Sequence, residues 1–154
     1  MLVISDTSTV TALLQIGQAD LLPTIFDRVI VPPAVRDELL RFHHSLPEFI
    51  GIGTIQDQQA ADMLERDLDR GEAEAIVLAE ESRADYLLMD EKRGRSMAEA
   101  RGLRVIGLLG LLLMAKKAGK VPSVRRIIAE LELQAGFFVS DAVKQIVLGA
   151  AGEL

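Results

Sequence analysis

Short apolar segments that alternate with helical segments are the feature that most limits the fold of this chain. Apolar-rich segments occur at residues 2–5, 28–31, 86–89 and 103–106, and apolar residues at helical spacing follow them. Strands of a parallel sheet read as continuous apolar runs because helices cover both faces of the sheet. The order therefore predicts an α/β protein with a central parallel sheet of four to five short strands, the fifth lying near residue 50.

The helical segments complete this expectation. Helices are expected over residues 6–16, around 33–39, and over 58–68, 72–82, 92–101, 108–118, 123–135 and 140–149. Gly71 is expected to separate two of them. A chain of 154 residues is long enough for one domain with a real core, and no linker or repeat interrupts it, so a single domain over residues 1–154 is expected.

Composition excludes several classes of protein. The chain has no cysteine, which excludes disulfides and thiolate metal sites and fits a reducing compartment. Its longest apolar stretch, residues 105–115, is too short to span a bilayer, and the apolar run at residues 2–4 is too short for a signal peptide. We therefore expect a cytoplasmic protein without a membrane segment.

Two aspartates directly follow predicted strands. Asp6 comes after the strand at residues 2–5, and Asp90 comes after the strand at 86–89. The carboxyl ends of parallel strands lie along one edge of the sheet, where ligands of such folds bind. Each aspartate alone is more often a helix cap. Together they predict a site at this edge.

Glutamates on neighbouring helices are candidates for the same site. Glu38 lies at the border of a buried helical face, three residues after Val35. Glu72 begins an apolar stripe and is the better inward candidate, whereas Glu74 aligns with Glu81 on a wetter face and is expected to support the site from outside. Converging carboxylates require a cation, and oxygen ligands without Cys or His select Mg²⁺ or Mn²⁺.

Charge is distributed unevenly along the chain. Residues 92–126 contain ten Lys or Arg and one acidic residue, although the formal net charge is −6. Lys92, Arg93 and Arg95 follow Asp90 within about a turn and a half of helix, where they could contact phosphates beside an acidic site. A carboxylate cluster flanked by basic residues suits metal-dependent cleavage of nucleic acid.

Four linked motifs carry a resemblance to a known family. "ISDTS", "VIVPPAVRDELL", "GEAEAIVLAEESRADYLLMDEKRGR" and "LRVIGLLGLLLMAKKAG" occur in this order. They resemble the PIN domain, and most of all a prokaryotic subgroup related to VapC-type toxins. The resemblance covers nearly the whole chain.

The resemblance implies a PIN-like three-layer α/β/α domain and a Mg²⁺/Mn²⁺-dependent endoribonuclease that is the toxin of a toxin–antitoxin pair. It implies that Asp6, Glu38, Glu72 and Asp90 hold the metal and carry catalysis, with Thr7 or Ser8 as polar support. Glu74 and Glu91 are candidate additional ligands. RNA, a small antitoxin protein and a second copy in a homodimer are the implied partners.

Two other functions stay open from the sequence. One is a catalytically weak PIN-fold module that binds RNA or a protein. The other is a phosphotransferase or phosphatase that uses Asp6 as its nucleophile, although such enzymes usually carry a second acid where Ser8 stands. His43 and His44 are expected to be exposed loop residues without a place in the site, and no aromatic stacking platform is legible.

Overall fold

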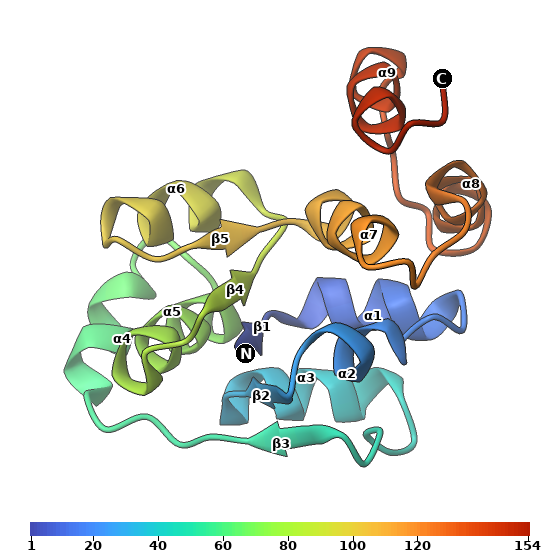
Figure 1. Cartoon of the computed structure of the whole chain (residues 1–154). Coiled ribbons are helices and arrows are strands. Elements are labelled where there is room, and N and C mark those ends of the chain that lie inside the picture. The colour runs from blue at the N-terminus through green and yellow to red at the C-terminus, as the bar shows by residue number, and fades with distance from the viewer.

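The computed structural model describes residues 1–154 and contains one parallel sheet between two layers of helices (Figure 1). The sheet has five strands in the order β3-β2-β1-β4-β5. The strands are β1 (Leu2–Ser5), β2 (Arg28–Val31), β3 (Ile50–Ile52), β4 (Tyr86–Leu88) and β5 (Val105–Ile106). All four pairings are parallel. The predicted α/β class and parallel sheet are confirmed.

Nine helices follow or connect the strands. They are α1 (Thr7–Gln15), α2 (Leu21–Ile25), α3 (Pro33–Phe42), α4 (Gln58–Leu64), α5 (Arg70–Ser82), α6 (Lys92–Ala100), α7 (Leu108–Lys117), α8 (Val124–Gln134) and α9 (Asp141–Ala150). None of them combines the length and the apolar character that a membrane crossing demands.

Alternate residues of each central strand enter different cores. In β1, Val3 packs in the cluster that contains α1, α2, α7 and α8, whereas Ile4 packs in the cluster that contains α4, α5 and α6. The same alternation separates Leu88 from Leu87 in β4. Since successive side chains of a strand point to opposite faces, each cluster covers one face of the sheet. This is the expected three-layer arrangement.

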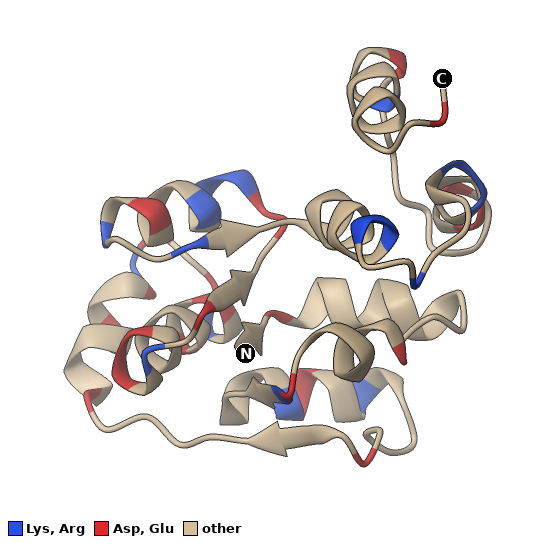
Figure 2. Cartoon of the chain, viewed as in Figure 1, with Lys and Arg blue, Asp and Glu red and all other residues tan.

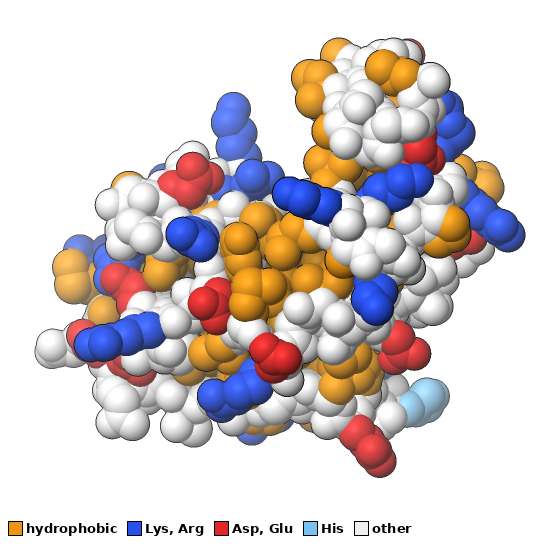
Figure 3. Space-filling view, in the orientation of Figure 1, with side chains coloured by type: hydrophobic (Ala, Val, Ile, Leu, Met, Phe, Trp, Pro, Cys, Tyr) orange, Lys and Arg blue, Asp and Glu red, His pale blue; other side chains and the backbone are white.

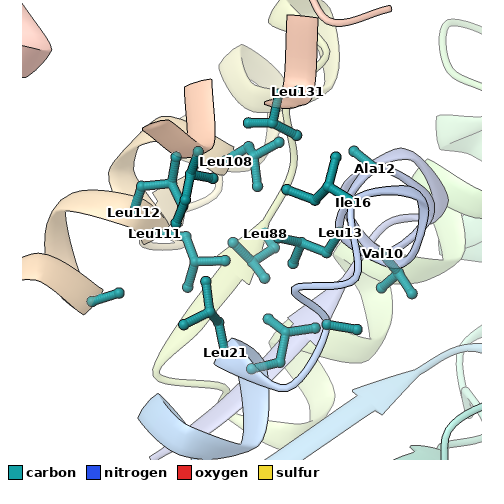
Figure 4. Packing of buried hydrophobic residues seen from close by; sticks show 14 of the residues in the cluster. Val10, Ala12, Leu13, Ile16, Leu21, Leu88, Leu108, Leu111, Leu112 and Leu131 are labelled. Atoms are coloured by element: carbon teal, nitrogen blue, oxygen red, sulfur yellow. The ribbon is translucent and has the colours of Figure 1, made fainter. Parts of the chain in front are cut away.

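The larger core joins the sheet to the C-terminal helices. Figure 4 shows Leu88 of β4 between Leu13 of α1 and Leu111 of α7. Leu131 of α8 belongs to the same cluster and is completely buried. The last helix, α9, contacts α7 and lies farthest from the sheet (Figure 1). The C-terminal helices α8 and α9 are therefore joined to the rest of the domain through α7 and, for α8, also through α1.

One helix was not expected, and one local expectation was wrong. No periodic pattern predicts α2, which is five residues long and contains Pro23. Gly71 does not separate two helices, because α5 already begins at Arg70 and Asp69 caps it. Residues 65–69 make the break instead, and Gly71 is buried in the first turn of α5.

Two leucines of α8 provide a test of this packing. Leu131 is 0% exposed and Leu133 is 86% exposed. Leu131→Ala should lower the free energy of unfolding by about 2–5 kcal/mol, because it leaves a cavity in the larger core. Leu133→Ala should change it by no more than about 0.5 kcal/mol. Urea unfolding followed by circular dichroism measures both, and equal effects of the two substitutions would contradict the docking of α8.

Candidate functional site

Two aspartates meet at the carboxyl edge of the sheet because their strands are neighbours. β1 pairs with β4, and Ser5 lies opposite Leu88 in the register. The Asp6 backbone N–H donates to the carbonyl oxygen of Leu88 at 3.0 Å, which extends the pairing by one step. The Asp90 N–H in turn lies 3.4 Å from Asp6 Oδ2. The expected proximity of Asp6 and Asp90 is therefore present.

The Asp6 carboxylate is buried and held by hydrogen bonds. It is 3% exposed, and it caps α1 by accepting from the Thr9 N–H at 3.0 Å. Ser8 Oγ donates to its other oxygen at 3.1 Å. Burial raises the pKa of Asp6 from 3.8 to about 6; the hydrogen bonds from Thr9 partly oppose this, and the nearby Asp90 carboxylate adds to it. The group carries negative charge that the protein alone does not balance.

Thr9 joins the two aspartates, and the sequence did not indicate this. Its side chain is fully buried, and its hydroxyl donates to Asp90 Oδ2 at 3.2 Å. The other oxygen of Asp90 accepts from the Leu108 N–H at 2.9 Å, at the start of α7. A Cβ on Gly107 would lie only 2.7 Å from that oxygen, so the backbone can approach Asp90 there only because residue 107 is glycine. Asp90 is thus fixed between α1 and α7.

A cavity of about 480 Å³ opens beside Asp6, between α1, α3 and the start of α5. Nine of its ten lining residues have polar or charged side chains. The lining residues are Asp6, Thr7, Ser8, Thr11, Gln15, Glu38, Phe42, His43, Asp69 and Glu72. Three of the four predicted acids therefore share one cavity. Asp90 lines a neighbouring cavity instead. Hydrogen bonds join it to Asp6, which lines the first cavity, and to Thr9.

The two glutamates of the cavity lie on α3 and α5, which pack against each other. Glu72 and Asp69 form a reciprocal capping box: the Glu72 N–H donates to Asp69 Oδ1 at 2.8 Å, and the Asp69 N–H donates to Glu72 Oε1 at 3.3 Å. Burial and then the Asp69 carboxylate raise the pKa of Glu72 to about 7. The same two causes raise the pKa of Glu38. Asp69 is an acidic member of the cavity that sequence reasoning missed, although its capping pattern was readable.

Glu74 and Glu91 lie outside this cavity. Glu74 was expected on a wetter face, but it is 4% exposed, because α5 packs against α3 there. Its carboxylate accepts from the Ala34 N–H at 3.0 Å and pairs with Arg70 at 3.2 Å. Glu91 is exposed and caps α6 by accepting from the Gly94 N–H at 3.4 Å. Glu91 is nevertheless near enough to Glu72 to contribute to the rise in its pKa.

The predicted phosphate-contacting residues take different positions. Thr7 and Ser8 line the cavity with the acids. Lys92 is exposed on the first turn of α6. Arg93 Nη2 forms an ion pair with Asp67 Oδ1 at 2.8 Å. Arg95 lines the neighbouring cavity together with Asp90, and its guanidinium lies beside Gly107.

His43 lines the cavity, contrary to the expectation that it has no place in the site, and Phe42 lines the cavity as well. The His43 Nε2 atom lies 3.4 Å from the Thr11 hydroxyl oxygen. Phe42 ends α3 and is 72% exposed. His44, in contrast, is exposed and does not line the cavity. Helical spacing from Glu38 to Phe42 was the sequence signal that could have placed the aromatic ring here.

The chemical type of the candidate ligands in this cavity suits a hard divalent cation. Every candidate ligand is a carboxylate or hydroxyl oxygen, which Mg²⁺ and Mn²⁺ prefer. The buried Thr7 Oγ1 has no hydrogen-bond partner of good geometry, although it lies near enough to Glu38 to oppose the rise in the pKa of that carboxyl. Three carboxylates have raised pKa values. No three acidic side chains of the chain are close enough to hold one ion together. The carboxylates share a cavity without forming a closed coordination group.

Comparison with known proteins gives one match. A family model for the PIN domain matches residues 2–153. No curated protein and no solved structure matches the chain significantly.

The buried carboxylate of Asp6 predicts a pH-dependent stability. Because its folded-state pKa of about 6 exceeds the ordinary 3.8, the folded protein binds this proton more tightly, and stability falls as pH rises through this range. The shift corresponds to at most about 3 kcal/mol. Asp6→Asn should therefore raise the free energy of unfolding in EDTA by about 1–3 kcal/mol at pH 8 and leave it nearly unchanged at pH 4.

Asp20→Asn is the matched control, since Asp20 is exposed and makes no side-chain cap. Its urea unfolding curves should follow those of the unmodified protein at both pH values. An Asp6→Asn protein less stable than the original at pH 8 would show that the hydrogen bonds of this carboxylate outweigh its burial.

Proposed function

The chain belongs to the PIN-domain family, a nuclease fold, and we propose that it is a metal-dependent endoribonuclease that hydrolyses RNA phosphodiesters. One observation carries the proposal: Asp6, Glu38 and Glu72 line a single polar cavity at the carboxyl edge of the sheet, and all three have raised pKa values. Structural carboxylates are normally paired with cations or hydrogen-bond donors. An excess of unbalanced carboxylates in a cavity indicates a site for a positive ligand.

No three acids are close enough to share one ion as they stand, so Asp6, Glu38 and Glu72 would hold Mg²⁺ or Mn²⁺ only after their side chains turned toward it. Asp90 would lie beside them, with the Thr7 hydroxyl as a further oxygen. Such an ion supplies a lowered pKa of bound water and neutralises charge on a phosphodiester. Asp6 is oriented for this task by the Thr9 N–H and the Ser8 hydroxyl. Thr9 and Leu108 hold both oxygens of Asp90 in fixed directions.

Basic residues next to the acids would bring an anionic strand to them. Figure 2 shows Lys and Arg on α6 directly after the acidic segment that follows β4. In Figure 3 basic side chains project over α6 and over the α7–α8 region, with an apolar area between them. Lys92 and Arg95 form no ion pair within the chain, whereas Arg93 is paired with Asp67. Lys92 and Arg95 are therefore better placed to contact phosphates than Arg93.

The finer assignment is a VapC-like toxin that a small antitoxin protein neutralises. Its support is the ordered set of motifs "ISDTS", "VIVPPAVRDELL" and "GEAEAIVLAEESRADYLLMDEKRGR", which resemble that subgroup. The alternative is a PIN-fold module that binds RNA without cleaving it. The open arrangement of the acids, with no three in one coordination group, favours this alternative and makes a cleavage assay decisive.

Cleavage of a mixed-sequence single-stranded RNA tests the proposal. We expect cleavage with Mn²⁺ and none with EDTA. Asp6→Asn should lower the rate at least about 10- to 100-fold, the loss that even outer-shell partners of a metal cause, whereas Asp20→Asn should retain full activity. Cleavage that persists in EDTA or in Asp6→Asn would refute the mechanism. RNA binding without cleavage under any metal condition would establish the binding module instead.

Gly71 offers a second test, because it separates stability from metal binding. A Cβ at this position would lie 2.4 Å from Glu38 Oε1 and 3.4 Å from Val35 Cγ2, so alanine must displace the Glu38 carboxylate. The helix itself would gain up to about 1 kcal/mol from the substitution. Gly71→Ala should thus be folded and no less stable, yet bind Mn²⁺ about 10-fold more weakly or worse by calorimetry.

Gly110→Ala is the control, because Gly110 is also inside a helix and its nearest neighbour would be Ile106 Cβ at an ordinary 3.6 Å. It should bind Mn²⁺ like the original chain. Unchanged affinity in Gly71→Ala would remove Glu38 from the set of ligands.

A further inference from the structure

The outer half of the cavity differs in chemistry from its acidic half. Phe42, His43, Thr11 and Gln15 line it, and none of them is acidic. We propose that this half is a nucleobase-binding subsite, in which one unpaired RNA base stacks on Phe42 and its polar edge faces Gln15 and His43. The inference rests on the proposed ribonuclease function and names a specificity element of that site.

Helix geometry sets the order of these groups along the cavity. On α1, Thr7, Thr11 and Gln15 follow one another at four-residue steps and so share one face. On α3, Glu38 and Phe42 are related in the same way. At 1.5 Å per residue, Phe42 lies about 6 Å beyond Glu38 along the helix axis, and Gln15 lies about 12 Å beyond Thr7. The cavity therefore runs from an acidic end to an aromatic and amide end.

Phe42 has the exposure that a stacking platform needs. Its side chain is 72% exposed, and the ring sits at the end of α3, where it lines the cavity. An exposed aromatic ring contributes little to folding, but an RNA base stacked on it would remove one face of each ring from water. Stacking of a base on an aromatic side chain contributes about 1–3 kcal/mol to binding.

Polar groups that line the same cavity as Phe42 can read the edge of a base. Gln15 is exposed and carries both an amide donor and a carbonyl acceptor. The close approach of the Thr11 hydroxyl to His43 Nε2, at 3.4 Å, orients the imidazole ring. Both residues thus present directional hydrogen-bonding groups beside Phe42.

The charge of the cavity favours a base over other ligands. Asp6, Glu38, Asp69 and Glu72 make the inner half anionic, so it would repel a free carboxylate ligand or an acidic peptide. A nucleobase is uncharged and planar, so the acids do not repel it, and its attached phosphate would approach the acidic end only when the divalent cation of the proposed function is bound there. The volume of about 480 Å³ lies within the range of small-molecule sites.

Binding of a fluorescent eight-nucleotide RNA, measured with Ca²⁺ in place of Mn²⁺, tests the subsite. Phe42→Ala should weaken binding about 5- to 150-fold, the equivalent of one stacked base. Phe42→Trp should preserve binding. The slope of affinity against salt should not change in Phe42→Ala, because stacking releases no counterions. RNAs with a single abasic position should identify one base whose removal weakens binding to the original chain but not to Phe42→Ala.

Phe138→Ala is the matched control, since Phe138 is 85% exposed in the connection between α8 and α9. It should bind RNA like the original chain, and thermal melting should show both alanine variants equally folded. Chemical-shift perturbation by free nucleosides gives a second reading at Phe42.

RNA binding that is indifferent to Phe42→Ala would overturn the subsite and leave the ribonuclease function standing. If nucleosides shifted the signals of Phe42 but RNA did not bind, the base-binding subsite would stand and the ribonuclease function would be overturned. If the chain bound neither RNA nor nucleosides, both the subsite and the ribonuclease function would be overturned.

Discussion

The buried carboxylate of Asp6 is the interaction on which the rest of the site depends. It accepts hydrogen bonds from Ser8 and Thr9 of α1 and lies against the Asp90 N–H that follows β4. One side chain therefore joins β1, the first helix and the neighbouring strand at the sheet edge. Burial opposes its ionisation, as its raised pKa shows. The carboxylate is thus held in a buried place where water does not solvate it, and the parallel pairing of β1 with β4 fixes its position.

Helix caps supply much of the acidity of this edge, so capping and function share the same residues. Asp6 caps α1, Asp69 and Glu72 form the capping box of α5, and Glu91 caps α6. The amino end of a helix carries partial positive charge, which stabilises nearby carboxylates. The helix ends thus compensate part of the repulsion among these acids. The pKa values of Asp6 and Glu72 are nevertheless raised, by burial first and by neighbouring carboxylates after it, so the helix ends do not offset the two effects together.

The sequence predicted the features that follow from local patterns. Apolar runs located the strands, and the rule that parallel strands end at one edge placed Asp6 beside Asp90. Features that depend on packing between distant elements were missed. The Thr9 hydroxyl reaches an acid 81 residues away, and His43 reaches the cavity because α3 packs against α1. Glu74 is buried only because α5 packs on α3. No periodicity within one segment encodes such contacts.

The two aspartates and the two glutamates of the site are held in place by different interactions. Hydrogen bonds through Thr9 fix Asp6 and Asp90, whereas the packing of α3 on α5 positions Glu38 and Glu72. Glu74 strengthens that packing, because its buried carboxylate accepts from the Ala34 N–H of α3 and pairs with Arg70 of α5. Gly71 lets Glu38 approach the first turn of α5 closely. The acids fixed by hydrogen bonds through Thr9 are the shorter aspartates. The acids positioned by helix packing are the longer glutamates, which have one more rotatable bond. Adjustment of the cavity to a ligand therefore falls to side chains that can move without disturbing the sheet.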